Sequence, residues 1–253
     1  VAEYYGDADE LHLSFNSPPL FTPWNADRWR AQIADNHRLI DGRGAWPTWV
    51  LSNHDNMRHR SRYGSEDRAR AALFLLLGLR GSPVLFAGEE LGLEDAVVPP
   101  DRVVDPGGRD GCRAPIPWTG APDHGWGTTD PWLPWPPDAD TRNVAALVAD
   151  GSSIVHLYRR LLAARRASPA LQLGDFLAVD APTGVVAWRR TITDAARHGG
   201  DASARVVAIN MSSDAAALDV AGRVLVSSDG LGEGQDFTGT VGPDRAVLIE
   251  PAT

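Results

Sequence analysis

Two short apolar runs on either side of a helix-length apolar segment constrain the fold of this chain more than any other feature. Residues 49–51 and 81–88 have the length and composition of buried strands, and the second run is bounded by Gly and Pro. Residues 65–78 lie between them and become apolar on nearly every side toward their end, which is typical of a buried helix. A strand, a buried helix and a second buried strand predict neighbouring strands of a parallel sheet.

A further strand and helix are predicted before these runs. Residues 10–16 alternate apolar and polar side chains, which predicts a strand with Leu11, Leu13 and Phe15 on one face. Residues 24–40 have helical spacing of their apolar side chains and begin with polar residues that can cap a helix. We therefore expect three strands of a parallel α/β sheet in the first part of the chain.

The sequence changes character after residue 168. An amphipathic helix is predicted over 151–167, with Ser152 or Ser153 as its cap. Short β-like runs separated by turn residues follow, and they predict a small antiparallel all-β domain. These runs are 176–179, 185–190, 205–210, 223–227 and 246–250. The expected division is an α/β domain over 1–170 and the β domain over 171–253.

Residues 94–142 have no usable periodicity and are rich in Pro, Gly, Asp and Trp. Loops of this length inside a compact domain are usually functional or disordered. Their four tryptophans favour order, and flat aromatic faces suit the apolar faces of sugar rings, although they can equally pin the loop onto the sheet. These tryptophans are Trp118, Trp126, Trp132 and Trp135.

Composition excludes several classes of function. The formal net charge of −9 over 253 residues argues against binding to nucleic acid, because phosphate recognition needs clustered cations. The longest strongly apolar run, 71–79, is too short to cross a membrane. A single cysteine, Cys112, excludes an internal disulfide and suits a reducing cytoplasm, and it is a candidate thiol nucleophile only on weak grounds. No pattern predicts a metal site or a cofactor, and none indicates an oligomeric state.

Polar residues cluster where the predicted strands end. Asn53-His54-Asp55 and Arg58 follow the first apolar run, Glu89 and Glu90 follow the second, and a third cluster spans 109–113. Ligands of parallel α/β sheets bind at the carboxyl ends of the strands. The residues alone suggest Asp55 paired with Glu89 or Glu90 as an acid and base acting on a glycosidic bond.

Structural explanations of the same clusters stay open on the residues alone. Asn53 or Asp55 can cap a helix. Of Glu89 and Glu90, one can be a buried, hydrogen-bonded carboxylate and the other a surface residue. Arg113 can form a salt bridge that stabilises a loop.

Three motifs together resemble a known family. Ser-Asn-His-Asp-Asn-Met-Arg at 52–58 resembles the end of the seventh barrel strand in the α-amylase family of glycoside hydrolases. The segments at 81–92 and 108–118 resemble its eighth strand and the loop that follows in α-glucosidases and oligo-1,6-glucosidases, and 11–16 is similar to its sixth strand. The resemblance implies the C-terminal part of a (β/α)₈ TIM barrel, about strands 6 to 8 with the long loop 94–142, followed by the β domain.

The resemblance also implies roles for individual residues. Asp55 matches the third catalytic carboxylate, which stabilises the oxocarbenium-like transition state. His54 and Arg113 match residues that bind the same glucose unit, and Arg58 matches a substrate-binding arginine, although Met57 replaces the usual proline before it. Glu89 and Glu90 match supporting positions, which makes their pairing with Asp55 as acid and base doubtful. The implied activity is retaining hydrolysis of small α-glucosides or oligosaccharides.

The family's nucleophile and general acid belong to motifs that this sequence does not contain. We therefore expect a C-terminal fragment of a longer parent enzyme, inactive alone, because a retaining mechanism needs both groups. Two other functions stay open: glucosyl transfer of the trehalose synthase or sucrose isomerase type, and a non-catalytic carbohydrate-binding homologue. The preference for α-1,4, α-1,6 or another linkage is not encoded in these segments.

Overall fold

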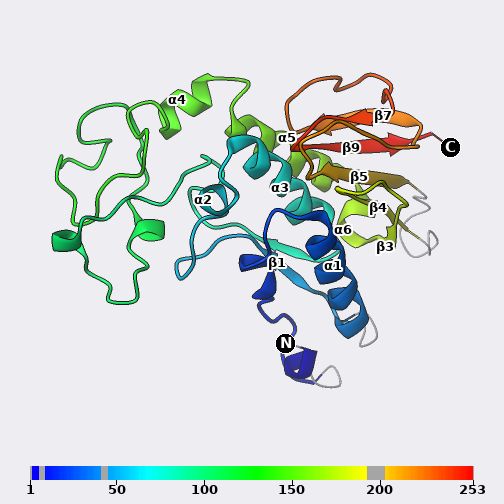
Figure 1. Cartoon of the computed structure of the whole chain (residues 1–253), viewed down its shortest axis with the longest axis horizontal. Coiled ribbons are helices and arrows are strands. Elements are labelled where there is room, and N and C mark those ends of the chain that lie inside the picture. The colour runs from blue at the N-terminus through cyan, green and yellow to red at the C-terminus, as the bar shows by residue number, and fades with distance from the viewer. Residues whose placement is uncertain (1, 6–8, 41–44, 193–202, 253) are drawn as a thin grey trace.

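The computed structural model describes residues 2–5, 9–40, 45–192 and 203–252 (Figure 1). The α-helices are α1 Ala26–Ile40, α2 His59–Tyr63, α3 Glu66–Gly78, α4 Val144–Ala149, α5 Ile154–Ala167 and α6 Pro169–Leu173. The short 3₁₀ turns among the described residues include Ala2–Tyr5, Pro18–Leu20, Pro100–Arg102 and Gly111–Arg113. The strands are β1 Thr48–Val50, β2 Ser82–Val84, β3 Asp175–Ala178, β4 Val185–Thr191, β5 Ala204–Asn210, β6 Ala216–Ala217, β7 Gly222–Ser227, β8 Thr240–Val241 and β9 Arg245–Pro251.

The two predicted strands form a parallel ladder, although β1 is buried throughout and β2, shorter than predicted, is only partly buried. β1 and β2 run in the same direction, with Trp49 opposite Pro83 and Val50 opposite Val84. The chain between them passes through α2 and α3, and the Ser65 side chain caps α3 by accepting a hydrogen bond from the Arg68 N–H at 3.2 Å. This strand–helix–strand order confirms the expected α/β arrangement and places the segment after Val50 at the carboxyl end of β1.

The strand predicted over residues 10–16 does not form. The Thr48 hydroxyl donates to the Ser14 carbonyl at 2.8 Å and accepts from the Asn16 N–H at 3.0 Å, so a side chain takes the place of a backbone ladder. The apolar face predicted for this segment is also not buried, because Leu13 and Phe15 are 47% and 67% exposed. Alternation indicated an extended chain with one apolar face, but a strand also needs a hydrogen-bonded neighbour.

The antiparallel β part matches the five predicted runs. β3, β4, β5, β9 and β7 form one antiparallel sheet in that order, and the short β6 and β8 pair on its outer side. One face of the large sheet packs on α3 and α5, as the central position of α3 in Figure 1 shows, and the other face encloses a second core with Leu218 and Val241.

The largest of the hydrophobic cores among the described residues joins the parallel and antiparallel parts. It contains Trp49 from β1, Leu75 from α3, Trp188 from β4 and Leu248 from β9, all at most 2% exposed. Two groups of β4 also bind the C-terminal end of α3, since the Trp188 indole N–H and the Arg190 guanidinium both donate to the Gly78 carbonyl at 3.0 Å. The apolar side chains of the two predicted domains therefore pack together. The domain boundary after residue 170 stays a prediction.

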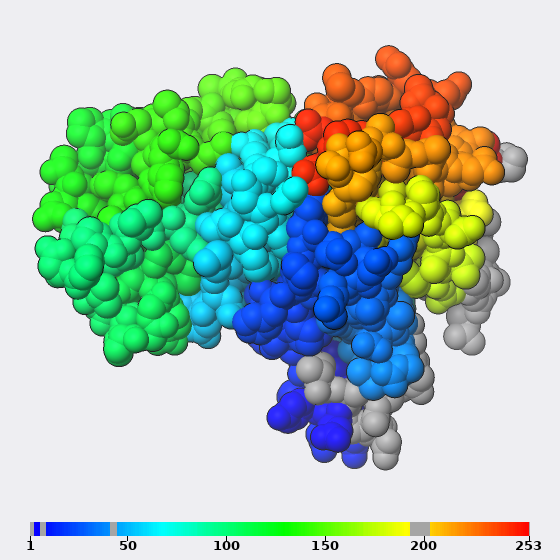
Figure 2. Space-filling model, viewed as in Figure 1, coloured from blue at the N-terminus to red at the C-terminus, as the bar shows by residue number. Residues whose placement is uncertain are grey.

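The loop 94–142 forms a lobe at one end of the molecule, drawn in green in Figures 1 and 2. Trp126 donates from its indole N–H to the Ile116 carbonyl at 2.7 Å, and Trp135 packs edge-on against His124 at 4.5 Å between ring centres. Trp118 and Trp132 are 49% and 72% exposed. No helix in the described residues is long and apolar enough to span a bilayer.

Candidate functional site

The turn after β1 is shaped by a local side-chain contact. The Asn53 carboxamide oxygen accepts from the Asp55 N–H at 3.0 Å and from the Asn56 side chain at 2.9 Å. α2 begins only at His59, and its N-cap residue, Arg58, makes no side-chain capping hydrogen bond. Asn53 therefore forms a local turn and does not cap the helix. This turn projects His54 and Asp55 from the carboxyl end of β1.

Asp55 lies where two arginines from the long loop meet the turn. Its Oδ1 is 2.9 Å from Arg109 Nη1 and 3.2 Å from Arg113 Nη2, and its Oδ2 is 3.4 Å from His54 Nε2. Arg113 also donates from Nε to the His54 carbonyl at 2.7 Å. The structure thus brings together three of the predicted site residues, Asp55, His54 and Arg113.

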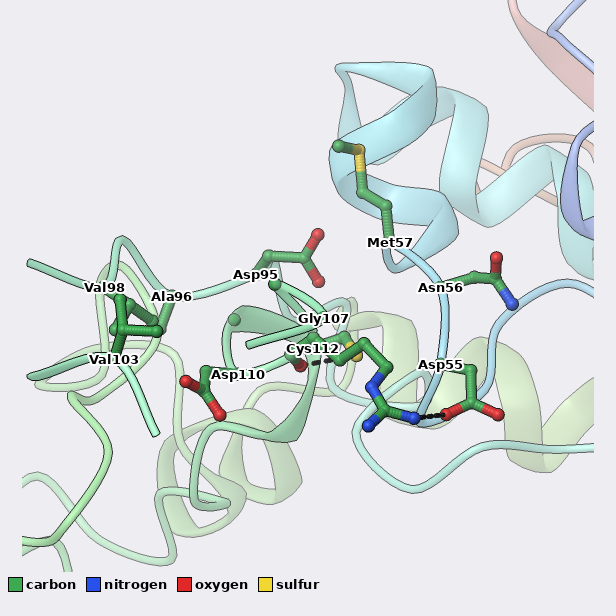
Figure 3. A pocket seen from close by; sticks show the side chains of 13 residues that line it. Asp55, Asn56, Met57, Asp95, Ala96, Val98, Val103, Gly107, Asp110 and Cys112 are labelled. Carbon is green, nitrogen blue, oxygen red and sulfur yellow. Dashed lines mark hydrogen bonds and ion pairs between the residues drawn. The ribbon is translucent and has the colours of Figure 1, made fainter. Parts of the chain in front are cut away.

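Arg109 was not among the predicted site residues, although its cluster was recognised. Its Nε and Nη2 each donate to Asp105 at 2.7 Å, and its backbone N–H donates to the same carboxylate at 3.0 Å. Nη1 then points to Asp55, as the dashed contact in Figure 3 shows. The signal available in the sequence was the place of Arg109 in that cluster, four residues before Arg113.

These contacts set the charge of Asp55. Partial desolvation raises its pKa, but the hydrogen bond from Arg109, the neighbouring His54 and the hydrogen bond from Arg113 lower it more, so the pKa of Asp55 lies below its ordinary value. The hydrogen bonds from Arg109 likewise hold the pKa of Asp105 well below the usual range. Asp55 is therefore an anion at neutral pH.

Asp55 borders two cavities. One, of about 350 Å³, is walled by Phe15, Leu20 and the strand ends at Val50 and Val84, with His54 at its rim. The other, of about 380 Å³ and shown in Figure 3, lies between the 55–57 turn and the loop segments 95–112. Among the described residues that line the first cavity, Asp55 is the one acid.

Arg58 occupies a different position from the other predicted site residues. Its side chain is buried at 3% exposure, donates to the Ala87 carbonyl at 2.9 Å, and lies 4.6 Å from the centre of the Phe86 ring. Burial lowers the pKa of Arg58. These contacts hold the segment after β2 against the turn, and direct contact of Arg58 with a substrate stays a prediction.

Glu89 and Glu90 do not share a cavity with Asp55. Glu89 is 2% exposed, and neither of its carboxylate oxygens has a hydrogen-bond partner among the described residues. Glu90 is the hydrogen-bonded member of the pair, since its Oε2 accepts from the Gly88 N–H at 2.8 Å. This placement contradicts the pairing of Asp55 with either of them across a bound substrate.

Cys112 and the acids of the loop do not form a metal or nucleophile site in the described residues. Burial raises the pKa of the Cys112 thiol, which disfavours the reactive thiolate, and its Sγ contacts the Arg109 carbonyl at 3.1 Å. No group of three or more His, Cys, Asp or Glu in the described ranges is arranged to hold a metal ion. The chemistry that the site offers is that of an exposed carboxylate flanked by hydrogen-bond donors.

Comparison with known proteins places this geometry in a family. Residues 12–174 match the model of the alpha amylase catalytic domain. The probable alpha-glucosidase of Rhizobium meliloti (strain 1021) is 32% identical over 92% of the chain, and the glucan 1,6-alpha-glucosidase of Streptococcus pneumoniae serotype 4 (strain ATCC BAA-334 / TIGR4) is 30% identical over 78%. The chain spans 43% and 40% of these two relatives.

A solved structure agrees with the expected architecture. The alpha-glucosyl transfer enzyme XgtA superposes with a TM-score of 0.79 at 31% identity, covering 98% of this chain and 48% of XgtA. This likeness confirms the expected fold, part of a (β/α)₈ barrel followed by an antiparallel β domain. The match to the catalytic-domain model extends from the irregular segment before α1 to the residue before β3. The chain therefore belongs to the α-amylase family and contains part of its catalytic domain.

Proposed function

We propose that the protein containing this chain is a retaining α-glucosidase that acts on small α-glucosides or oligosaccharides. The observation that carries the proposal is the position of Asp55, at the carboxyl end of β1 with His54 and Arg113 in contact with it. Active sites of (β/α)₈ barrels lie at this end of the strands. The similarity to a probable alpha-glucosidase and a glucan 1,6-alpha-glucosidase supports the same class of activity.

The charge of Asp55 suits stabilisation of a positively charged transition state. Glycosidic bond cleavage passes through an oxocarbenium-like species, and a carboxylate with a lowered pKa stays anionic beside it. The imidazole of His54 and the guanidinium of Arg113 supply donors for sugar hydroxyls. Phe15, Leu85 and Phe86 give the adjoining cavity apolar walls that suit the carbon face of a sugar ring.

Asp55 alone does not provide a retaining mechanism. One further carboxyl must protonate the leaving oxygen and another must attack the anomeric carbon. Among the described residues lining the cavity at the strand ends, no other acid is present. We therefore propose that the 253-residue chain alone is inactive and that the parent protein supplies these two groups.

The test uses the full-length parent protein and an aryl α-glucoside. We expect α-glucose to be the first product, as detected by NMR at early times. We also expect Asp55→Asn to lower kcat by more than about 100-fold, which is the order that one preorganised electrostatic group contributes. Asp219→Asn, an exposed aspartate of the β part, should leave the rate unchanged. Release of β-glucose first, or full activity of Asp55→Asn, contradicts the proposal.

A second candidate function is glucosyl transfer. The likeness to XgtA over 98% of the chain favours it, because the same glucosyl intermediate can be passed to a sugar hydroxyl instead of water. Product analysis on maltose and sucrose distinguishes the two: free glucose as the main product supports hydrolysis, and an isomerised or elongated sugar supports transfer.

A further inference from the structure

The turn that carries Asp55 is closed at its base by a buried contact. Ser52 Oγ accepts a hydrogen bond from the His59 backbone N–H at 2.9 Å and lies 2.9 Å from Nδ1 of the same residue. Both residues are 1% exposed. Ser52 follows the end of β1 and His59 is the first residue of α2, so this one hydroxyl joins the two ends of the turn.

The same histidine faces the segment after β2. His59 Nδ1 lies 3.7 Å from Oε1 of Glu89, whose side chain is also 1% exposed. That carboxylate has no hydrogen-bond partner among the described residues, and the imidazole is one of its polar neighbours, together with the buried guanidinium of Arg58. The ring of Tyr63 packs edge-on against His59 at 6.1 Å. A leucine could fill this space and would keep the backbone N–H bond to Ser52, but it would lose the side-chain contact at Nδ1.

A second contact at the base comes from Arg62 on α2, whose guanidinium donates to the Leu51 carbonyl at 3.1 and 3.2 Å, while the remaining contacts shape the turn locally. Asn53 holds the Asp55 N–H, and the Arg58 N–H donates to Asp95 in the long loop at 3.0 Å. Neither contact ties the turn to the strand from which it starts. A displacement of about 1 Å at a reacting centre is enough to lower a rate about 100-fold, so the direction in which Asp55 projects matters.

We propose that His59 is a positioning residue for Asp55, acting by holding the start of α2 against Ser52 at the end of β1 and against Glu89 after β2. The inference rests on the proposed function of Asp55. It concerns a residue that is buried and does not line either cavity beside Asp55. The role depends on a hydrogen-bonding atom at the Nδ1 position and not on the volume of the side chain.

The experiment compares His59→Leu and His59→Asn in the full-length protein. We expect His59→Leu to lower kcat on an aryl α-glucoside by about 10- to 100-fold with KM changed less than about threefold, because the turn loses the side-chain contact between Nδ1 and Ser52. His59→Asn places an amide near the Nδ1 position and should restore kcat to within about fivefold of the wild type.

A matched control separates positioning from packing. His124 is also buried, at 4% exposure, and its Nδ1 contacts the Thr119 carbonyl at 3.0 Å within the long loop. His124→Leu should lower the melting temperature but leave kcat within about twofold. Should His59→Leu fail to fold, Ser52→Ala is the second variant, because it removes both contacts of the shared hydroxyl without adding bulk, and an unchanged KM then excludes a direct effect through the cavity that Ser52 lines.

The possible outcomes distinguish failure of the positioning inference from failure of the proposed function. If Asp55→Asn abolishes activity while folded His59→Leu, or Ser52→Ala in its place, retains wild-type kcat, the positioning inference is wrong and the proposed function stands. Folded His59→Asn as impaired as His59→Leu also overturns the inference, because the hydrogen bond would then not be the property that matters. Full activity of Asp55→Asn removes the proposed function itself.

Discussion

The two ends of the turn between β1 and α2 are held in opposite ways. At its tip, Asp55 is 45% exposed and shares one oxygen between two arginines of the long loop. At its base, Ser52 and His59 are buried and bind each other through a hydroxyl. Exposed ion pairs contribute little to stability and are readily exchanged, whereas buried polar groups are costly to leave unpaired. The tip is thus suited to exchange its partners for a ligand, and the base to stay fixed.

The largest effect is expected at the tip. Arg113→Ala removes contacts to both the Asp55 carboxylate and the His54 carbonyl and should lower kcat/KM of the full-length protein by about 100-fold. Arg38→Ala breaks a similar exposed ion pair, to Asp35 at 3.0 Å on α1, and should leave kcat/KM unchanged. A loss smaller than threefold for Arg113→Ala would show that the tip contacts have no catalytic consequence.

At the base we expect a change in stability. Ser52→Ala leaves the buried His59 N–H and ring nitrogen without their partner and should lower the free energy of unfolding by about 1–3 kcal/mol. The exposed Ser213→Ala should change it by less than about 0.5 kcal/mol. Denaturant titration of the full-length protein measures both, and equal values for the two variants would remove the contrast between base and tip.

A smaller effect concerns the pH dependence. Arg109 is the main group that lowers the pKa of Asp55, so Arg109→Ala should raise that pKa. Activity requires the carboxylate and is lost as the pH falls through its pKa, so the acid limb of kcat/KM should move to higher pH in the variant. The stabilisation that Asp55 gives the folded state is likewise present above its unfolded-state pKa and lost at acid pH. An unmoved acid limb would mean that Arg109 does not control this charge.

The smallest effect is expected from salt. Raising the ionic strength from 0.1 to 1 M shortens the screening length from about 10 to about 3 Å, which weakens exposed charge pairs. The acid limb of the kcat/KM profile of the wild type should therefore shift slightly to higher pH. The acid limb of the Arg109→Ala profile should shift less. The contact between Ser52 and His59 is buried, so salt should not change the kcat ratio of His59→Leu to wild type.

Helices and strands whose pattern of apolar and polar residues is complete within one segment were predictable from sequence. α3 follows from its Ser65 cap and continuous apolar run, and the strands of the antiparallel sheet follow from short alternating or apolar runs between turns. Residues 10–16 failed because strand formation depends on a neighbour, and here the Thr48 side chain satisfies the backbone. α4 and α6 were missed because helices of five or six residues leave too short a pattern to detect.

The site was predictable only in part. Motif resemblance selected Asp55, His54 and Arg113, and the structure places these three in contact, while their roles stay predictions. Arg109 lay in a recognised cluster, but nothing in the sequence specified that both arginines of that cluster would reach Asp55. The bond between Ser52 and His59 depends on how a strand end and a helix start meet, which no local pattern encodes.

The contact of Trp188 and Arg190 with the Gly78 carbonyl bears on how this protein can be recombined with its relatives. A Cβ at Gly78 would lie 3.0 Å from the Val207 side chain, so the end of α3 fits this sheet surface closely. A chimera that exchanges only the segment after residue 170 would meet a foreign surface at that point. We therefore expect a stable chimera to take the sheet and the end of α3 from the same parent, although the two lie on opposite sides of the predicted domain boundary.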